Sequence, residues 1–104
     1  VTRGWLGIEP QDITPELAKA SKLRQHDGVI IAGVLRNGPA SQAGVRVGDI
    51  VLKLNDAAVY DTAGFLNQIA PLAPKSEVTL TILRSGRKMK IDVAVGIRPR
   101  ITKP

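Results

Sequence analysis

The sequence contains no cysteine and only one histidine, His26, among its 104 residues. Without cysteine there is no disulfide framework, no zinc site built on thiolates and no cysteine nucleophile. One imidazole is too few for a metal site made of several histidines, so we predict neither a metal nor a cofactor. No apolar run approaches the roughly 20 residues needed to span a bilayer, so membrane insertion is not expected.

The chain also lacks an initiator methionine and a recognisable signal peptide, since it begins directly at Val1. We therefore expect it to be a segment of a longer protein. Its length predicts a single folded domain, and its apolar fraction of 43% is enough to build one core.

Aromatic residues are scarce, with only Trp5, Tyr60 and Phe65 in a chain that carries a net charge of +6. A positive charge of this size suggests nucleic-acid binding as an alternative function. Proteins that bind unpaired bases, however, stack them on aromatic side chains, which are scarce here. One group of basic residues is interrupted by a predicted turn and by apolar residues: Arg84, Arg87, Lys88 and Lys90. We therefore favour a solvated basic surface and predict no nucleic-acid partner; a binder would show steep salt dependence.

No catalytic constellation is apparent. His26 lies in a polar stretch just before Gly28, which favours an exposed loop position, and no serine lies in a G-x-S-x-G elbow. The glycine patterns that bind phosphates or dinucleotides are missing as well. We therefore predict that this chain by itself is not an enzyme.

The local patterns predict a compact α+β domain with a curled, mostly antiparallel sheet of five or six short strands and two or three helices. A Thr14 cap followed by proline begins a helix that we expect to end near Leu23. Asp61 or Thr62 begins a second, longer helix. The expected strands are 28–35, 50–54, 78–83 and 89–95, and the last two form a hairpin about a Ser-Gly turn. We place the domain at 1–96 and interpret 97–104 as a basic tail or linker.

The segment Gly38-Pro39-Ala40-Ser41-Gln42-Ala43-Gly44-Val45-Arg46-Val47-Gly48-Asp49-Ile50-Val51-Leu52-Lys53-Leu54-Asn55 resembles the core signature of PDZ domains. Locally, Pro39 begins a short helix, and Gly44 ends it in a left-handed conformation. The Gly48-Asp49 turn then leads into a strand. These residues identify the family and shape the fold, and we do not expect them to bind ligand.

The amino end, Arg3-Gly4-Trp5-Leu6-Gly7-Ile8 with 11–18 behind it, resembles the PDZ domain that follows the protease domain in HtrA (Do-like) serine proteases. The resemblance covers residues 3–96 and implies a partly open, mostly antiparallel β-sandwich or barrel with the permuted strand order of bacterial PDZ domains. It further implies a periplasmic or cell-envelope protease as the parent protein, with its catalytic domain upstream.

The resemblance also implies where a peptide binds. The backbone amides of Leu6, Gly7 and Ile8 match the loop that captures a C-terminal carboxylate, and Arg3 is expected to add charge there or to be merely exposed. The resemblance assigns these residues to the peptide groove: Trp5, Glu9, Pro10, Gln11, Thr62, Leu66 and Ile69.

Several groove positions carry further expectations. For Leu66 or Ile69, the competing interpretation is that the side chain belongs to the core rather than to the groove. Phe65 is expected in the core. Thr62 occupies the place of a ligand-reading histidine in one PDZ class, so strict Ser/Thr selectivity is not expected. We expect a valine at position 7 to remove peptide binding and to change the melting temperature by only a few degrees.

The resemblance implies a module that captures hydrophobic C-terminal tails of unfolded or signalling proteins and regulates or supplies a protease. The alternative is a structural domain that packs against neighbouring subunits and has no ligand of its own. The expected partners are C-terminal peptides and the protease domain of the same chain, and we expect the isolated domain to be monomeric.

Overall fold

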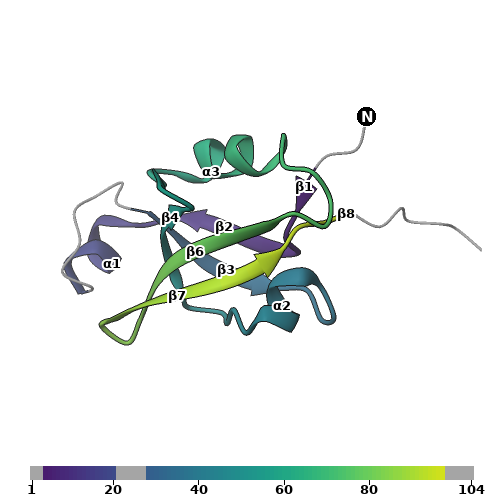
Figure 1. The fold of residues 1–104 in the computed structure, drawn as a ribbon. Coiled ribbons are helices and arrows are strands. Elements are labelled where there is room, and N and C mark those ends of the chain that lie inside the picture. The colour runs from purple at the N-terminus through teal and green to yellow at the C-terminus, as the bar shows by residue number, and fades with distance from the viewer. Residues whose placement is uncertain (1–3, 21–27, 98–104) are drawn as a thin grey trace, which may run out of the picture.

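The computed structural model of the chain describes residues 4–20 and 28–97. Within these ranges lie eight strands and three helices (Figure 1). In chain order they are β1 (Gly4–Trp5), β2 (Ile8–Asp12), α1 (Pro15–Ala20), β3 (Val29–Val34), α2 (Pro39–Ala43), β4 (Ile50–Leu54), β5 (Ala57–Ala58), α3 (Thr62–Ile69), β6 (Glu77–Arg84), β7 (Arg87–Ala94) and β8 (Gly96–Ile97). Four of the sequence-based expectations concern residues outside the described ranges. They are the end of the first helix near Leu23, the loop position of His26, the position of Arg3 and most of the proposed tail.

The main sheet has six strands in the order β2-β3-β4-β6-β7, with β5 paired to β4, and every pairing is antiparallel. A separate short ladder joins β1 to β8, so the first and last described strands lie side by side. The predicted α+β class and the mostly antiparallel, open sheet are confirmed, and the six strands of the main sheet agree with the predicted five or six; β1 and β8 are two short strands outside it. Because β2 forms one edge of the main sheet in the described part of the chain, it is available to a further strand.

Local signals explain where the helices begin and end. The Thr14 hydroxyl accepts a hydrogen bond of 3.1 Å from the Leu17 amide at the start of α1. Gly44 closes α2 at φ 100°, a conformation that suits glycine. Asp61, rather than Thr62, caps α3, because its side chain accepts a hydrogen bond of 2.7 Å from the Gly64 amide. Within the described ranges, no helix combines the length and apolarity that crossing a membrane requires.

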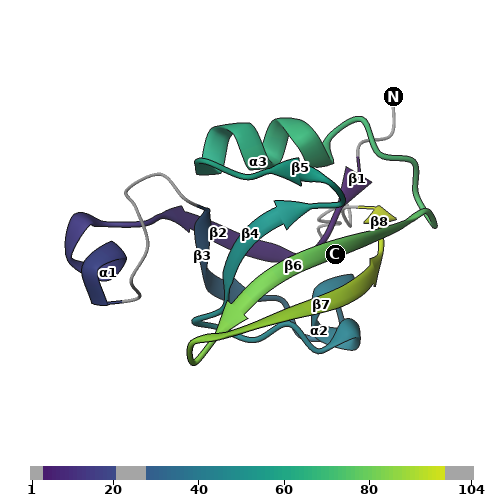
Figure 2. The ribbon, with the colours of Figure 1, turned by 60° about the vertical axis from the view of Figure 1, so that its left-hand side comes forward.

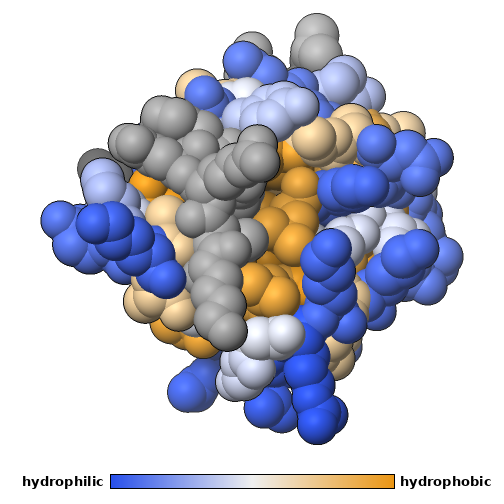
Figure 3. All heavy atoms as spheres, turned by 90° about the vertical axis from the view of Figure 1, so that its left-hand side faces the viewer, coloured by the Kyte–Doolittle hydropathy of each residue, from blue (hydrophilic) through white to orange (hydrophobic). Residues whose placement is uncertain are grey.

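The main core lies inside the curled sheet, between α3 on one side and α2 on the other (Figures 1 and 2). Phe65 of α3 is fully buried, which confirms its predicted core position. A second apolar cluster joins α1 to the outer face of the sheet through Ile13, Ala18 and Ile50. Figure 3 shows apolar surface on this face, where Leu17 and Leu83 line a hollow of about 570 Å³.

Candidate functional site

The loop between β1 and β2 is held by both of its carbonyl groups. The Leu6 carbonyl accepts a hydrogen bond of 2.9 Å from the Ala40 amide at the start of α2, and the Gly7 carbonyl accepts one of 2.8 Å from the Leu35 amide. No peptide bond in the described chain is cis. In a trans peptide the amide N–H points opposite to the carbonyl of the same unit. The N–H groups of Gly7 and Ile8 are therefore directed away from α2 and β3.

Gly7 makes this arrangement possible because its φ is +71°. A positive φ lets successive amides converge on one side, as in the backbone nests that bind anions. A Cβ added at Gly7 would lie 3.4 Å from the Pro39 ring and 3.5 Å from Gly38 Cα. The space is tight but sufficient, so the strain of a substitution here arises from the backbone. Because L side chains rarely adopt this φ, we now expect Gly7→Val to lower the melting temperature by more than the few degrees predicted from the sequence.

The free edge of β2 begins at Ile8. Ile8 lies opposite Val34, and the Leu35-to-Gly7 hydrogen bond identifies this as a non-hydrogen-bonded pair, so the polar backbone groups of Ile8 face outward. Further along β2, Pro10 lies opposite Ile31. The Ile31 N–H donates to the Asp49 carbonyl and the Ile31 carbonyl accepts from the Gly48 amide, so neither group of Ile31 is directed at Pro10. Pro10 therefore also presents its carbonyl to the free edge, despite the bulge between positions 9 and 10.

Helix α3 forms the second wall beside β2 (Figures 1 and 2). Its first amide, Thr62 N–H, donates a 2.7 Å hydrogen bond to Oδ1 of Asp12 at the end of β2. This bond fixes the start of α3 against the strand. The sequence offers no signal for this bond, because the two residues are 50 positions apart.

The side chains assigned to the groove differ in exposure. Leu66 is 49% exposed on α3, whereas Ile69 and Leu6 are buried in the main core, and Ile8 is half-buried against that core. The Thr62 hydroxyl is buried without a hydrogen-bond partner among the described residues. Leu66 is therefore the large apolar side chain of α3 that is exposed and free to contact a ligand, while Ile69 and Leu6 are buried in the core below the groove.

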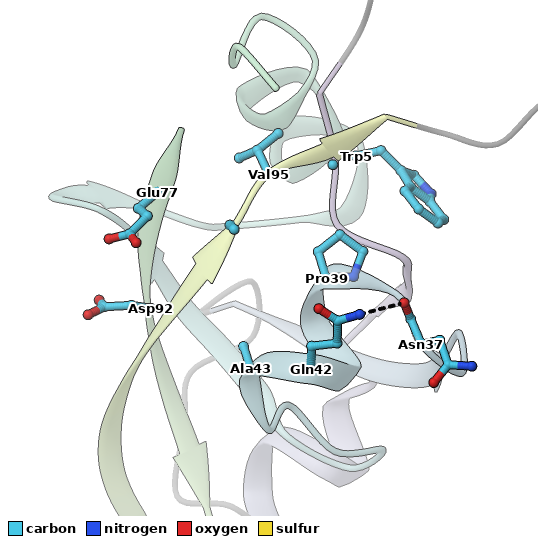
Figure 4. Close-up of a pocket in the computed structure, with 10 residues that line it drawn as sticks. Trp5, Asn37, Pro39, Gln42, Ala43, Glu77, Asp92 and Val95 are labelled. Carbon is cyan, nitrogen blue, oxygen red and sulfur yellow. Dashed lines mark hydrogen bonds between the residues drawn. The ribbon is translucent and has the colours of Figure 1, made fainter. Parts of the chain in front are cut away.

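The Trp5 ring lies beside Pro39 of α2 and Gly96 of β8. Together with Pro39 and Gly96 it lines a hollow of about 520 Å³ between α2 and β7 (Figure 4). Glu77 and Asp92 lie at the other end of this hollow. The Trp5 ring also packs against the loop between β1 and β2, because a Cβ added at Gly7 would lie 3.5 Å from this ring.

Glu9 and Gln11 are exposed and alternate with Ile8 and Pro10 along β2. They therefore lie on the outer face of the strand. Arg3, the fourth residue assigned to the carboxylate, lies outside the described residues. The structure thus brings a loop with two outward amides, a free strand edge and the α3 wall to one place, and this arrangement suits an extended chain that ends in a carboxylate.

Comparison with known proteins agrees with this geometry. Residues 4–95 match the family described as PDZ domain. The chain is 34% identical over 99 residues to the "Probable periplasmic serine endoprotease DegP-like" of Pseudomonas putida strain F1, covering 95% of this chain and 21% of that protein. The chain thus spans about a fifth of the length of the curated relatives it matches.

Solved structures show the same fold. A variant of the HtrA-type protease AlgW with a decapeptide superposes with a TM-score of 0.92 and 36% identity over 100% of this chain and 32% of that one. The HtrA3 PDZ domain bound to a phage-derived ligand has a TM-score of 0.77 at 22% identity, with coverages of 93% and 88%, and supports the fold alone. The chain therefore belongs to the PDZ domain family, and among PDZ domains it is of the kind found in HtrA-type serine endoproteases.

Proposed function

We propose that this chain binds the C-terminal end of an extended peptide by adding it as a strand to the free edge of β2. The observation that carries the proposal is the orientation of the Gly7 and Ile8 amides, which converge where the edge begins. A carboxylate at this point accepts both N–H groups. The preceding peptide backbone then runs antiparallel to β2, and its last side chain lies between Ile8 and Leu66.

The proposed role within the parent protein is regulation of, or substrate supply to, a trypsin-like serine protease domain in the periplasm. The names of the relatives support this role, and a solved HtrA-type relative was determined with a decapeptide. The aliphatic character of Ile8 and Leu66 favours Val, Ile, Leu, Phe or Ala as the last ligand residue over a charged one.

The test compares one pentapeptide ending in valine, with a free or an amidated C-terminus, by calorimetric titration. Hydrogen bonds to a charged group contribute about 1.5–3 kcal/mol, so amidation is expected to weaken binding about tenfold or more. Equal affinity of the two forms, or no binding of either, would contradict the proposal. The second result would favour a domain that only packs against its neighbours.

Pro10 limits how firmly the strand edge holds a ligand, because proline has no N–H to donate to a ligand carbonyl. Pro10→Ile is expected to tighten binding of the free peptide about 2- to 12-fold, since one hydrogen bond contributes about 0.5–1.5 kcal/mol net. Pro10→Ala restores the same N–H without the larger side chain and serves as the matched control. If neither variant binds more tightly in calorimetry, the ligand does not pair with β2 at this position.

A further inference from the structure

The side chain of Glu9 lies where it would face one particular residue of a bound peptide. If the carboxylate lies on the Gly7 and Ile8 amides, the last ligand residue pairs with Ile8, and the chain runs back along β2 in the antiparallel sense. The penultimate residue then lies directly opposite Glu9. Residues directly opposite in an antiparallel pair project from the same face, so both side chains lie on the outer face.

The spacing of this pair is favourable for contact. The polar backbone groups alternate along β2, so those of Ile8 and Pro10 face the ligand and those of Glu9 face β3. Toward the ligand, Glu9 is therefore a member of a non-hydrogen-bonded pair, the kind in which the Cα atoms approach to about 4.5 Å and side chains are closest.

The carboxylate of Glu9 is available for such a contact. The Glu9 side chain is exposed and lies over Gly33, its partner on β3, where an added Cβ would lie 2.9 Å from Oε2. Gly33 therefore contributes no side chain that competes for this surface. Among the described residues, the only ion pair is that of Arg84 with Asp49, so Glu9 has no cationic partner there.

We propose that Glu9 selects peptides with lysine or arginine as the penultimate residue. This inference rests on the proposed peptide-binding function and adds the chemistry of one ligand position to it. An exposed cross-strand pair of opposite charge contributes modestly, and like charges in the same place are unfavourable. We expect lysine to bind about threefold more tightly than alanine at this position, and glutamate about threefold more weakly.

The experiment uses pentapeptides of alanine ending in valine that carry Lys, Ala or Glu as the penultimate residue, titrated calorimetrically into the wild-type chain, Glu9→Gln and Glu9→Lys. We expect a Lys-over-Glu affinity ratio of roughly ten in the wild type, near one in Glu9→Gln and inverted in Glu9→Lys. A fourth peptide with its lysine moved to the first position keeps the net charge and should bind like the alanine peptide.

The control variant is Glu16→Lys, which makes the same charge change on the exposed first turn of α1, beyond the other end of β2 (Figure 1). It should leave the ratio as in the wild type. An unaltered ratio in both Glu9 variants, or an equal shift in Glu16→Lys, would overturn the inference while the alanine peptide still binds. Failure of the alanine peptide to bind would instead overturn the proposed function itself.

Discussion

Replacing Asp49 with asparagine is expected to lower the free energy of unfolding by about 2 kcal/mol and the melting temperature by about 10 °C. Asp49 is only 2% exposed. Its Oδ1 accepts a 2.9 Å hydrogen bond from Nε of Arg84, and its Oδ2 accepts one of 2.7 Å from the same guanidinium and one of 2.9 Å from the Arg46 amide. Asparagine would turn an NH₂ group toward one of these donors.

The contact links segments that are distant in the sequence. Arg84 is the last residue of β6, next to the turn of the β6–β7 hairpin, and it also donates a 2.9 Å hydrogen bond to the carbonyl of Gly44, the C-cap of α2. Asp49 therefore links the turn before β4 to the β6–β7 hairpin. Loss of its charge weakens the hydrogen bonds to Arg84 in the hairpin and to the Arg46 amide in the turn.

The effect of Asp49→Asn should depend on pH in a defined direction. Burial raises the pKa of Asp49, but the hydrogen bonds from Arg84 and the Arg46 amide, together with the Arg84 charge, lower it more, so the net pKa is below its usual value. A carboxylate with a lowered folded pKa stabilises the fold above its unfolded pKa of about 3.9, and loses this contribution as the pH falls through the folded value. The gap between wild type and variant should shrink below about pH 4.

Urea unfolding at neutral pH and near pH 3 measures this gap. The matched control is Asp92→Asn on the same hairpin, where the carboxylate is exposed and accepts a 2.7 Å hydrogen bond from the Thr79 hydroxyl. Its effect should stay within about 0.5 kcal/mol. Equal losses in the two variants would contradict the role assigned to Asp49.

Replacing Gly7 with valine is expected to weaken peptide binding roughly 100-fold, because two amide hydrogen bonds to the carboxylate are lost together. A β-branched residue is strongly disfavoured at the observed φ of +71°, so the loop must rotate to accept it. Rotation turns the Gly7 and Ile8 amides away from the ligand. The same strain should cost about 2 kcal/mol of stability.

Gly48→Val separates the loss of binding from the loss of stability. Gly48 has φ +95°, and an added Cβ there would meet nothing within 4 Å, so the backbone strain is comparable. It lies in the turn before β4, away from the loop. Calorimetric titration and urea unfolding of both variants should show similar destabilisation but retained binding in Gly48→Val. Parallel loss of binding in both variants would show that stability alone is responsible.

Much of the fold follows from short-range signals in the sequence. The start of α2 at Pro39, its end at Gly44 and the Asn55 turn at φ 53° all depend on the conformational preferences of single residues. The alternation of Ile91, Val93 and their exposed neighbours predicts the last strand in the same way. Because these preferences act over a few residues, they are readable without knowledge of the rest of the chain.

The candidate site depends on both levels. The resemblance pointed to the loop at Gly7, and a glycine there is what the observed positive φ requires. The resemblance, however, assigned Leu66 and Ile69 together to the groove, and only the packing of α3 on the sheet separates them into a half-exposed and a buried side chain. The assignments of Leu6, Gly7, Ile8 and the groove residues to a peptide stay predictions until the titrations are done.

Long-range partners were decided only by the tertiary structure. The Asp12 bond to the start of α3 and the Asp49–Arg84 pair join residues 50 and 35 positions apart. The outward direction of the loop amides likewise depends on hydrogen bonds to Leu35 and Ala40. A charged or polar side chain carries no sign of its partner in the sequence, because the pairing arises only when the sheet closes over the core and brings the two segments together.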